Sequence, residues 1–197
     1  MRITKEAGKF PRTKQQLADA FLELSKVTEV PRISVKEICE MCGILRQSFY
    51  YHFHDKYELV AWIFEQDFMM EARRAERINS EEMICSMLHR LQAREAFYRS
   101  AIQDVNQNNL YEYIIQLYIT MNTEIMRVYL KTDVLDSELL YDLQSYSYAC
   151  AFHTREWLAG REKMSPELFA ERMYRDMPEL LKKAYQTGIR PACFRVC

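Results

Sequence analysis

The segment from residue 33 to residue 59 constrains the fold more than any other part of the chain, because it carries start and stop signals for two short helices. Ser34 and Glu37 form a capping box, in which the Ser34 hydroxyl accepts from the Glu37 amide and the Glu37 carboxylate accepts from the Ser34 amide. Gly43 follows at the position where a left-handed residue ends a helix. We expect the second helix to begin near Leu45. The segment therefore predicts a helix-turn-helix.

The second helix is predicted to have one apolar side and one polar side. Leu45, Phe49 and Phe53 recur at every fourth position, so we expect them to face the first helix. The opposite side carries Arg46, Gln47, Ser48, Tyr50 and Tyr51. Each of these residues by itself is equally compatible with an ordinary solvated surface. Tyr50, Tyr51 and the adjacent His52, however, form an aromatic cluster on a short polar helix. Such a cluster favours a surface that binds a partner.

Each outward residue has chemistry that suits DNA in the major groove. Arg46 can donate two hydrogen bonds to a guanine edge, and Gln47 can bind an adenine edge. Each such pair discriminates between bases by ~1–3 kcal/mol. Ser48, Tyr50 and Tyr51 can reach phosphates or thymine methyl groups.

Two further residues are expected to contact the DNA backbone. His52 lies nearer the inner side of the same helix and is placed to touch a phosphate. Asp55 caps a third helix, and Lys56 lies in its first turn. A lysine beside the exposed amides of a helix N-terminus suits a phosphate oxygen. We include Ser34, at the start of the first helix, among the predicted DNA-binding residues.

The order of residues across these helices follows a known pattern. The matching positions are Ser34, Ile38, Gly43-Ile44-Leu45, the run RQSFYYHF from Arg46 to Phe53, Lys56 and Leu59. This pattern resembles the DNA-binding domain of the TetR/AcrR family of transcriptional regulators, most closely the subgroup of probable dihydroxyacetone-kinase regulators. Leu45 departs from the family, which usually has a capping serine there, so the second helix loses a cap worth ~1 kcal/mol. Gln47 replaces a common glycine and adds a side chain that can contact a base.

The resemblance implies nine helices, and the composition agrees with an all-α fold. Only four glycines and five prolines occur in 197 residues. We expect residues 1–54 to form a three-helix DNA-binding domain and residues 55–197 to form a six-helix regulatory and dimerisation domain. The first helix is expected over about residues 13–28. The others follow at about 34–42, 45–53, 55–77, from 80, 95–102, 110–131, 137–158 and 166–186.

The resemblance also implies a homodimer. In this family the last two long helices pair with their copies in a four-helix bundle, which here places the interface at about residues 136–160 and 166–186. The apolar content of both segments is compatible with this interface, although the core of a single chain could also absorb it. A twofold dimer predicts two recognition helices on successive major grooves and a palindromic operator.

The effector is expected to act on the second domain. Six residues are candidates for lining a small-molecule pocket: Trp62, Phe68, Tyr111, Tyr118, Tyr146 and His153. Arg155 is a seventh candidate, but it lies two residues from His153 and so does not share its face. Aromatic residues at helical spacing are more often core than pocket. A protein coactivator is the alternative effector. These residues determine neither the operator sequence nor whether the protein represses or activates transcription.

An enzyme is not expected, and neither is a cofactor or a bound metal. Phosphate-binding loops, nucleophile motifs and clustered metal ligands are missing from the sequence. Cys39-x-x-Cys42 invites a zinc or redox interpretation, but both cysteines also fit as small packing residues of the first helix. Cys193 and Cys197 lie near the C-terminus. The alternative function is a helical adaptor that binds only proteins.

Charge and hydropathy set the remaining expectations. Residues 1–57 carry ten Lys/Arg against seven Asp/Glu, whereas the rest of the chain is acidic. The basic residues of the first fourteen positions either follow the DNA or form a solvated end. Apolar runs all fall short of the ~20 residues that span a membrane, and the N-terminus lacks a signal peptide's apolar core. We therefore expect a cytoplasmic protein that binds double-stranded DNA and no membrane.

Overall fold

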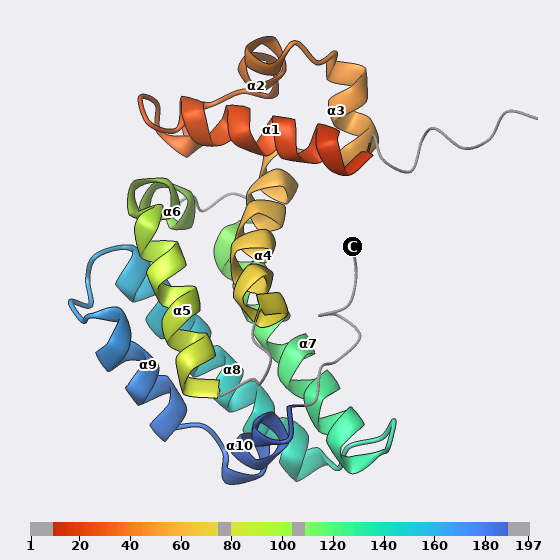
Figure 1. Ribbon diagram of the computed structural model, residues 1–197, viewed down its shortest axis with the longest axis vertical. Helices are drawn as coiled ribbons and strands as arrows, with labels where there is room; N and C mark the ends of the chain where they lie inside the picture. Colours follow the sequence, from red (N-terminus) through yellow and green to blue (C-terminus); the bar gives the residue numbers. More distant parts are fainter. Residues whose placement is uncertain (1–9, 75–79, 104–108, 189–197) are drawn as a thin grey trace, which may run out of the picture.

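The chain folds entirely into helices over the part that the computed structural model describes, residues 10–74, 80–103 and 109–188. The all-α prediction is confirmed, since these residues form ten α-helices, one 3₁₀ turn and no strand (Figure 1). The elements are α1 (Phe10–Leu24), η1 (Val30–Arg32), α2 (Val35–Cys42), α3 (Arg46–His52), α4 (Lys56–Arg74), α5 (Ser80–Ala93), α6 (Glu95–Ile102), α7 (Leu110–Leu130), α8 (Ser137–Leu158), α9 (Pro166–Arg175) and α10 (Glu179–Gln186). The basic residues of positions 1–9 and the cysteines at 193 and 197 lie outside the described residues.

Helices α1, α2 and α3 form a small bundle, here called the head, at one end of the molecule (Figure 1). Phe21, Ile38 and Phe49 are completely buried at its centre, and Phe53 is 2% exposed. The prediction that Leu45 joins this apolar row is wrong, because its side chain is 76% exposed. Leu45 is the extended residue that precedes α3, so it does not follow the helical spacing that turns Phe49 inward.

The first helix begins and ends earlier than predicted. It covers Phe10–Leu24 rather than residues 13–28. Beyond Leu24 the chain turns, and the amide of Thr28 still donates to the Leu24 carbonyl oxygen at 3.0 Å. Val27 is 85% exposed, so no apolar burial favours another helical turn at this point.

The remaining helices, α4 to α10, form the body. Helix α4 leads from beneath the head into the body, where α5 packs on α9 and α7 packs on α8 (Figure 1). Buried polar groups also join these helices. Asn122 of α7 donates to the Ser147 hydroxyl of α8 at 3.0 Å, and Tyr185 of α10 donates to the Asn122 side-chain oxygen at 3.0 Å. Because unpaired buried polar groups are costly, these bonds select one arrangement of the three helices.

The predicted last helix is divided, and the predicted number of nine helices is therefore wrong for the described residues. A single helix was expected over residues 166–186, but α9 ends at Arg175 and α10 begins at Glu179. Pro178 lies between them as the residue preceding α10, and its ring leaves no amide hydrogen to continue a helical ladder. The start is as predicted, since Ser165 caps α9 and Pro166 occupies its first position.

Candidate nucleic-acid interface

The predicted capping box and glycine turn are both present in the head. The Glu37 amide donates to the Ser34 hydroxyl oxygen at 3.3 Å, and the Ser34 amide donates to a Glu37 carboxylate oxygen at 2.8 Å. These bonds from Ser34 lower the pKa of Glu37. Gly43 then ends α2 with φ +67°, a left-handed conformation that suits a residue without a Cβ. The turn places α3 directly after α2.

Helix α3 presents a polar and aromatic surface to solvent. Its five predicted base and phosphate contacts, Arg46, Gln47, Ser48, Tyr50 and Tyr51, are all exposed. Tyr51 is 72% exposed and Tyr50 is 58% exposed, although tyrosine side chains are usually at least partly buried. Phe49 fixes this orientation, because its completely buried ring packs edge-on against Tyr50 at 5.4 Å. The buried Phe49 side chain therefore fixes which side of α3 faces solvent.

The inner side of α3 meets the start of α1. The Lys14 ammonium lies 5.1 Å from the centre of the Phe53 ring, so α1 brings a cation to the end of α3. His52 is partly buried there, as predicted for a residue on the inner side. Burial, followed by the Lys14 charge, lowers the pKa of His52. Its imidazole is therefore mostly neutral at neutral pH and offers hydrogen bonds rather than charge to a partner.

Lys56 is placed beside the head with its ammonium engaged by backbone carbonyls. Its Nζ atom donates to the carbonyl oxygens of Val30 at 3.1 Å, Pro31 at 2.6 Å and Ile33 at 2.9 Å. An ammonium has three N–H donors. A phosphate contact, as predicted for this residue, would replace one of these bonds. Asp55 caps α4 as predicted, since its carboxylate accepts from the amides of Tyr57 and Glu58 at 2.8 Å.

The two cysteines of α2 are packing residues. Cys39 is 3% exposed, and burial raises the pKa of its thiol. Cys42 lies one turn further on, and its Sγ atom donates to the Ile38 carbonyl oxygen at 3.1 Å. Both thiols are free. The burial of Cys39 and the backbone contact of Cys42 agree with the packing interpretation of this pair.

The head contacts the body through α6. The Val30 amide donates to the Ser100 hydroxyl oxygen at 2.9 Å, and the rings of Phe21 and Phe97 meet edge-on at 5.8 Å. Neither contact is predictable from the sequence, because the partners lie far apart along the chain. Helix α6 therefore reaches the turn before α2, as Lys56 of α4 also does.

Comparison with known proteins places this geometry in a family. Residues 79–178 match the TetR-family model described as "Transcriptional regulator C-terminal region". The chain belongs to the TetR family of transcriptional regulators. The predicted family is thereby confirmed, as is its regulatory rather than enzymatic class.

Individual TetR-family relatives cover most of the chain. The "HTH-type dhaKLM operon transcriptional activator DhaS" of Lactococcus lactis subsp. lactis (strain IL1403) is 28% identical over 177 residues, covering 86% of this chain and 88% of that protein. A solved structure of "Dihydroxyacetone kinase operon activator DhaS" has a TM-score of 0.59 and 23% identity, over 90% of this chain and 98% of that chain. A TetR-family regulator from Streptomyces coelicolor has a TM-score of 0.54 and 14% identity, over 91% and 90%. Both structures share the fold.

Three of the six predicted pocket residues of this TetR-family body lie together. Phe68, Tyr118 and Tyr146 border a cavity of about 30 Å³, and most of the other side chains around it are apolar. Burial raises the pKa of Tyr146 and of Tyr118 far above the usual value, so both hydroxyls stay protonated. Pockets for drug-sized ligands usually have volumes of about 300–1,000 Å³. The space between these side chains has room for about two water molecules.

The other three predicted pocket residues are placed elsewhere. Trp62 packs on Phe53 at 6.1 Å, where α4 leaves the head. Tyr111 lies under the Arg155 guanidinium at 4.4 Å. His153 borders an open groove of about 610 Å³ between α8 and α9, which Tyr146 also reaches. The structure therefore divides the six residues among a small cavity, a groove and two packing contacts.

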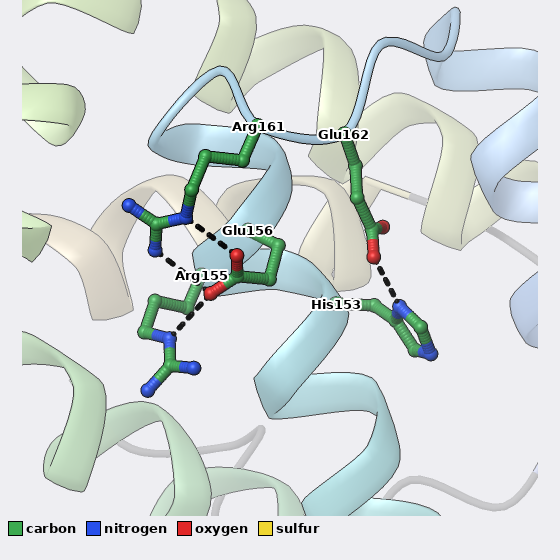
Figure 2. Close-up of polar contacts among 5 residues, drawn as sticks. All are labelled: His153, Arg155, Glu156, Arg161 and Glu162. Atoms are coloured by element: carbon green, nitrogen blue, oxygen red, sulfur yellow. Dashed lines mark hydrogen bonds and ion pairs between the residues drawn. The ribbon is translucent and has the colours of Figure 1, made fainter.

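The end of α8 shows that His153 and Arg155 face different ways, as their spacing predicts (Figure 2). His153 pairs with Glu162 at 2.8 Å, whereas Arg155 donates to Glu156 at 2.9 Å. Arg161 also reaches the Glu156 carboxylate, with its Nε atom at 2.5 Å. The hydrogen bonds from Arg161, supported by those from Arg155, lower the pKa of Glu156 to about 2.

Two groups of polar residues in the body were not predicted from the sequence. Asp67 is 1% exposed on α4 and accepts from Arg94 at 2.8 Å and from the Tyr98 hydroxyl at 2.6 Å. Burial raises the pKa of Asp67, although Tyr98 and Arg94 act in the opposite direction. The second group combines Cys85 and His89 of α5 with a carboxylate of α9. The spacing of Cys85 and His89, one helical turn, was the available signal.

Proposed function

We propose that the chain is a sequence-specific regulator that binds a palindromic operator as a homodimer. The observation that carries this proposal is the exposed face of α3, where Tyr51 is 72% exposed on a helix anchored by the completely buried Phe49. A rigid helix with an exposed polar and aromatic face suits direct reading of base edges. The membership of the TetR family supports the same function.

The proposed contacts divide into base reading and positioning. Arg46 and Gln47 lie in the first turn of α3 and reach base edges, whereas Ser48, Tyr50 and Tyr51 contact phosphates or thymine methyl groups. His52, neutral and partly buried, adds a backbone contact at the inner edge. Ser34 holds α2 and hence the turn before α3. Lys56 is left out of the proposed phosphate contacts, because its ammonium already donates to three backbone carbonyls.

The proposed dimer uses the outward face of α8. Three large side chains of this helix remain exposed on the single chain: Tyr141 by 70%, Tyr148 by 52% and Phe152 by 44%. They recur at helical spacing, with the small residues Ser145 and Ala149 between them, so another helix can approach closely. In a homodimer with a twofold axis beside α8, this row of side chains packs against the same row of the second subunit. Residues 136–160 are thus the main interface, and 166–186 contribute from α9 and α10.

The proposed effector acts on residues 55–197 and changes the spacing of two heads formed by residues 1–54. Its two candidate routes are the groove that His153 borders, for a small molecule, and the body surface, for a protein coactivator. The cavity beside Tyr118 is too small for a drug-sized ligand, so a small-molecule effector would bind in the groove. The name of the Lactococcus relative suggests that the regulated genes belong to a dihydroxyacetone-kinase operon.

The experiment that tests this function is selection of bound sequences from random duplex DNA by the purified chain at two salt concentrations. A palindromic motif is expected, with affinity that falls steeply with salt because phosphate contacts release counterions. The variant Arg46→Ala should lose about 1–3 kcal/mol of operator binding and relax the preference at one base position. Arg99→Ala removes the same charge from an exposed position on α6, outside the proposed dimer interface and the groove, and should leave the motif unchanged.

Three outcomes would contradict the proposal. Enrichment of no sequence, with or without salt, would favour the adaptor that binds only proteins. Specific binding that survives the double variant Arg46→Ala/Tyr51→Ala would mean that α3 is not the recognition helix. A motif without twofold symmetry would remove the homodimer. Circular dichroism of each variant shows that the helices are intact.

A further inference from the structure

Three side chains with metal-binding atoms converge where α5 packs on α9. Cys85 and His89 lie one turn apart on α5, and Glu167 lies in the first turn of α9. One ligand atom from each of them lies within 4.8 Å of the other two. His89 Nε2 and Glu167 Oε1 lie 2.7 Å apart. Two ligands of one tetrahedral ion lie about 3.3–3.7 Å apart, because each bond measures about 2.0–2.3 Å. Binding of an ion would therefore move the His89 and Glu167 side chains slightly apart.

The three donor types define which ion fits. A thiolate, an imidazole and a carboxylate together suit Zn²⁺, which binds sulfur, nitrogen and oxygen in tetrahedral sites. Hard ions such as Ca²⁺ and Mg²⁺ take oxygen ligands instead. Residues four apart on a helix project from the same side, so Cys85 and His89 reach one ion without bending α5. Three protein ligands leave the fourth tetrahedral position for water.

The surroundings of the three ligands favour a cation. Burial raises the pKa of the Cys85 thiol, and the carboxylates of Glu167 and Glu81 raise it further. The same negative charges attract a metal ion, which then displaces the thiol proton. The Ser165 side chain hydrogen-bonds to the Glu167 carboxylate. Such outer contacts commonly orient the ligands of metal sites.

We propose that Cys85, His89 and Glu167 bind a zinc-class divalent ion that joins α5 to α9. The ion replaces the hydrogen bond between His89 and Glu167 with two coordinate bonds and adds a third from the Cys85 sulfur. Because α5 and α9 lie side by side in the body (Figure 1), coordination fixes their register. The site lies outside the proposed DNA surface and outside the groove beside His153, so it is a separate binding site of this chain.

Titration of the reduced, metal-free full chain with Co²⁺ tests this site. Co²⁺ takes the place of Zn²⁺ and reports a bound thiolate through a near-ultraviolet charge-transfer band. We expect the band to saturate at one ion per chain and to disappear when Zn²⁺ is added. Cys85→Ser should abolish the band, whereas His89→Gln and Glu167→Gln should each weaken binding by at least about tenfold. Zn²⁺ should also raise the melting temperature of the wild type but not of Cys85→Ser.

Matched cysteine variants separate this site from other thiols. Cys42→Ser removes half of the Cys39-x-x-Cys42 pair, and Cys193→Ser/Cys197→Ser removes the C-terminal pair; both variants should keep the band. A band that survives Cys85→Ser, or one that either control abolishes, would overturn the proposal. Absence of binding by a chain with intact helical circular dichroism would mean that His89 and Glu167 form an ion pair only. A conservative Glu167→Asp variant should retain part of the affinity, unlike Glu167→Gln.

Discussion

The Ser100 hydroxyl oxygen accepts a hydrogen bond of 2.9 Å from the amide of Val30, and thereby ties the body to the head. Ser100 lies three residues from Phe97 on α6, so both residues face the same way. Phe97 packs edge-on against Phe21 of α1 at 5.8 Å. Any displacement of α6 therefore acts on a polar and an apolar contact at once. This pair of contacts is a short route by which an event in the body can reach the head.

The first prediction concerns this link. Ser100→Ala removes the hydroxyl oxygen that accepts from the partly buried Val30 amide. The free energy of unfolding should therefore fall by about 1–2 kcal/mol. Urea denaturation followed by circular dichroism measures the change. Ser137→Ala, at an exposed position on α8, is the control and should change stability by less than about 0.5 kcal/mol. Equal stability of the two variants would show that the link contributes nothing.

The second prediction concerns Lys56, whose ammonium donates to three backbone carbonyls of the head. Lys56→Met removes the charged donor but keeps most of the apolar stem, so we expect a loss of about 1.5–3 kcal/mol in stability. The dependence of operator affinity on salt should keep its slope. A slope reduced by about one would instead show that Lys56 neutralises a phosphate. Filter binding over a series of salt concentrations distinguishes the two results.

The third prediction concerns the proposed dimer face. Tyr148→Glu places like charges near the twofold axis and removes a half-exposed aromatic ring, so the dimer dissociation constant should rise at least about tenfold. Sedimentation velocity over a range of concentrations measures this constant. Val128→Glu introduces the same charge on the exposed side of α7 and should leave the association unchanged. A Tyr148→Glu protein that remains dimeric would place the interface elsewhere.

The fourth prediction follows from the pKa of Glu156, which bonds from Arg161 and then Arg155 hold at about 2, below the ordinary 4.5. Folding therefore favours the ionised carboxylate. This contribution to stability is complete above about pH 4.5 and is lost as the pH falls toward about 2. Glu156→Gln should accordingly be less stable than the wild type at about pH 7, and the difference should shrink by about pH 3. Salt should also reduce it, because the arginines are partly exposed.

Glu138→Gln is the matched control for this fourth prediction. It removes an exposed carboxylate from the first turn of the same helix, α8. Its effect on stability should be small at every pH. If the difference between the wild type and Glu156→Gln grows as the pH falls, the sign of the proposed linkage is wrong.

Local chemistry made the helices of this chain predictable from its sequence. Ser34 with Glu37, Asp55 and Ser165 each supply an acceptor for the free amides at a helix start, and Gly43 adopts the left-handed conformation of a helix end. Such signals act over a few residues and need no tertiary partner. The surface of α3 was predictable for the same reason, since helical spacing assigns Phe49 inward and Tyr51 outward.

Tertiary structure decided the features that depend on residues far apart in the chain. The sequence showed the aromatic rings of the body, but only packing separated Phe68 and Tyr118, which border the small cavity, from Trp62, which supports α3. Only the contact of α5 with α9 brought Cys85 and Glu167 together. Helical spacing determines which side of a helix a residue occupies. Which helix covers that side depends on the packing of the whole core, where shape and buried hydrogen bonds select among many compatible pairings.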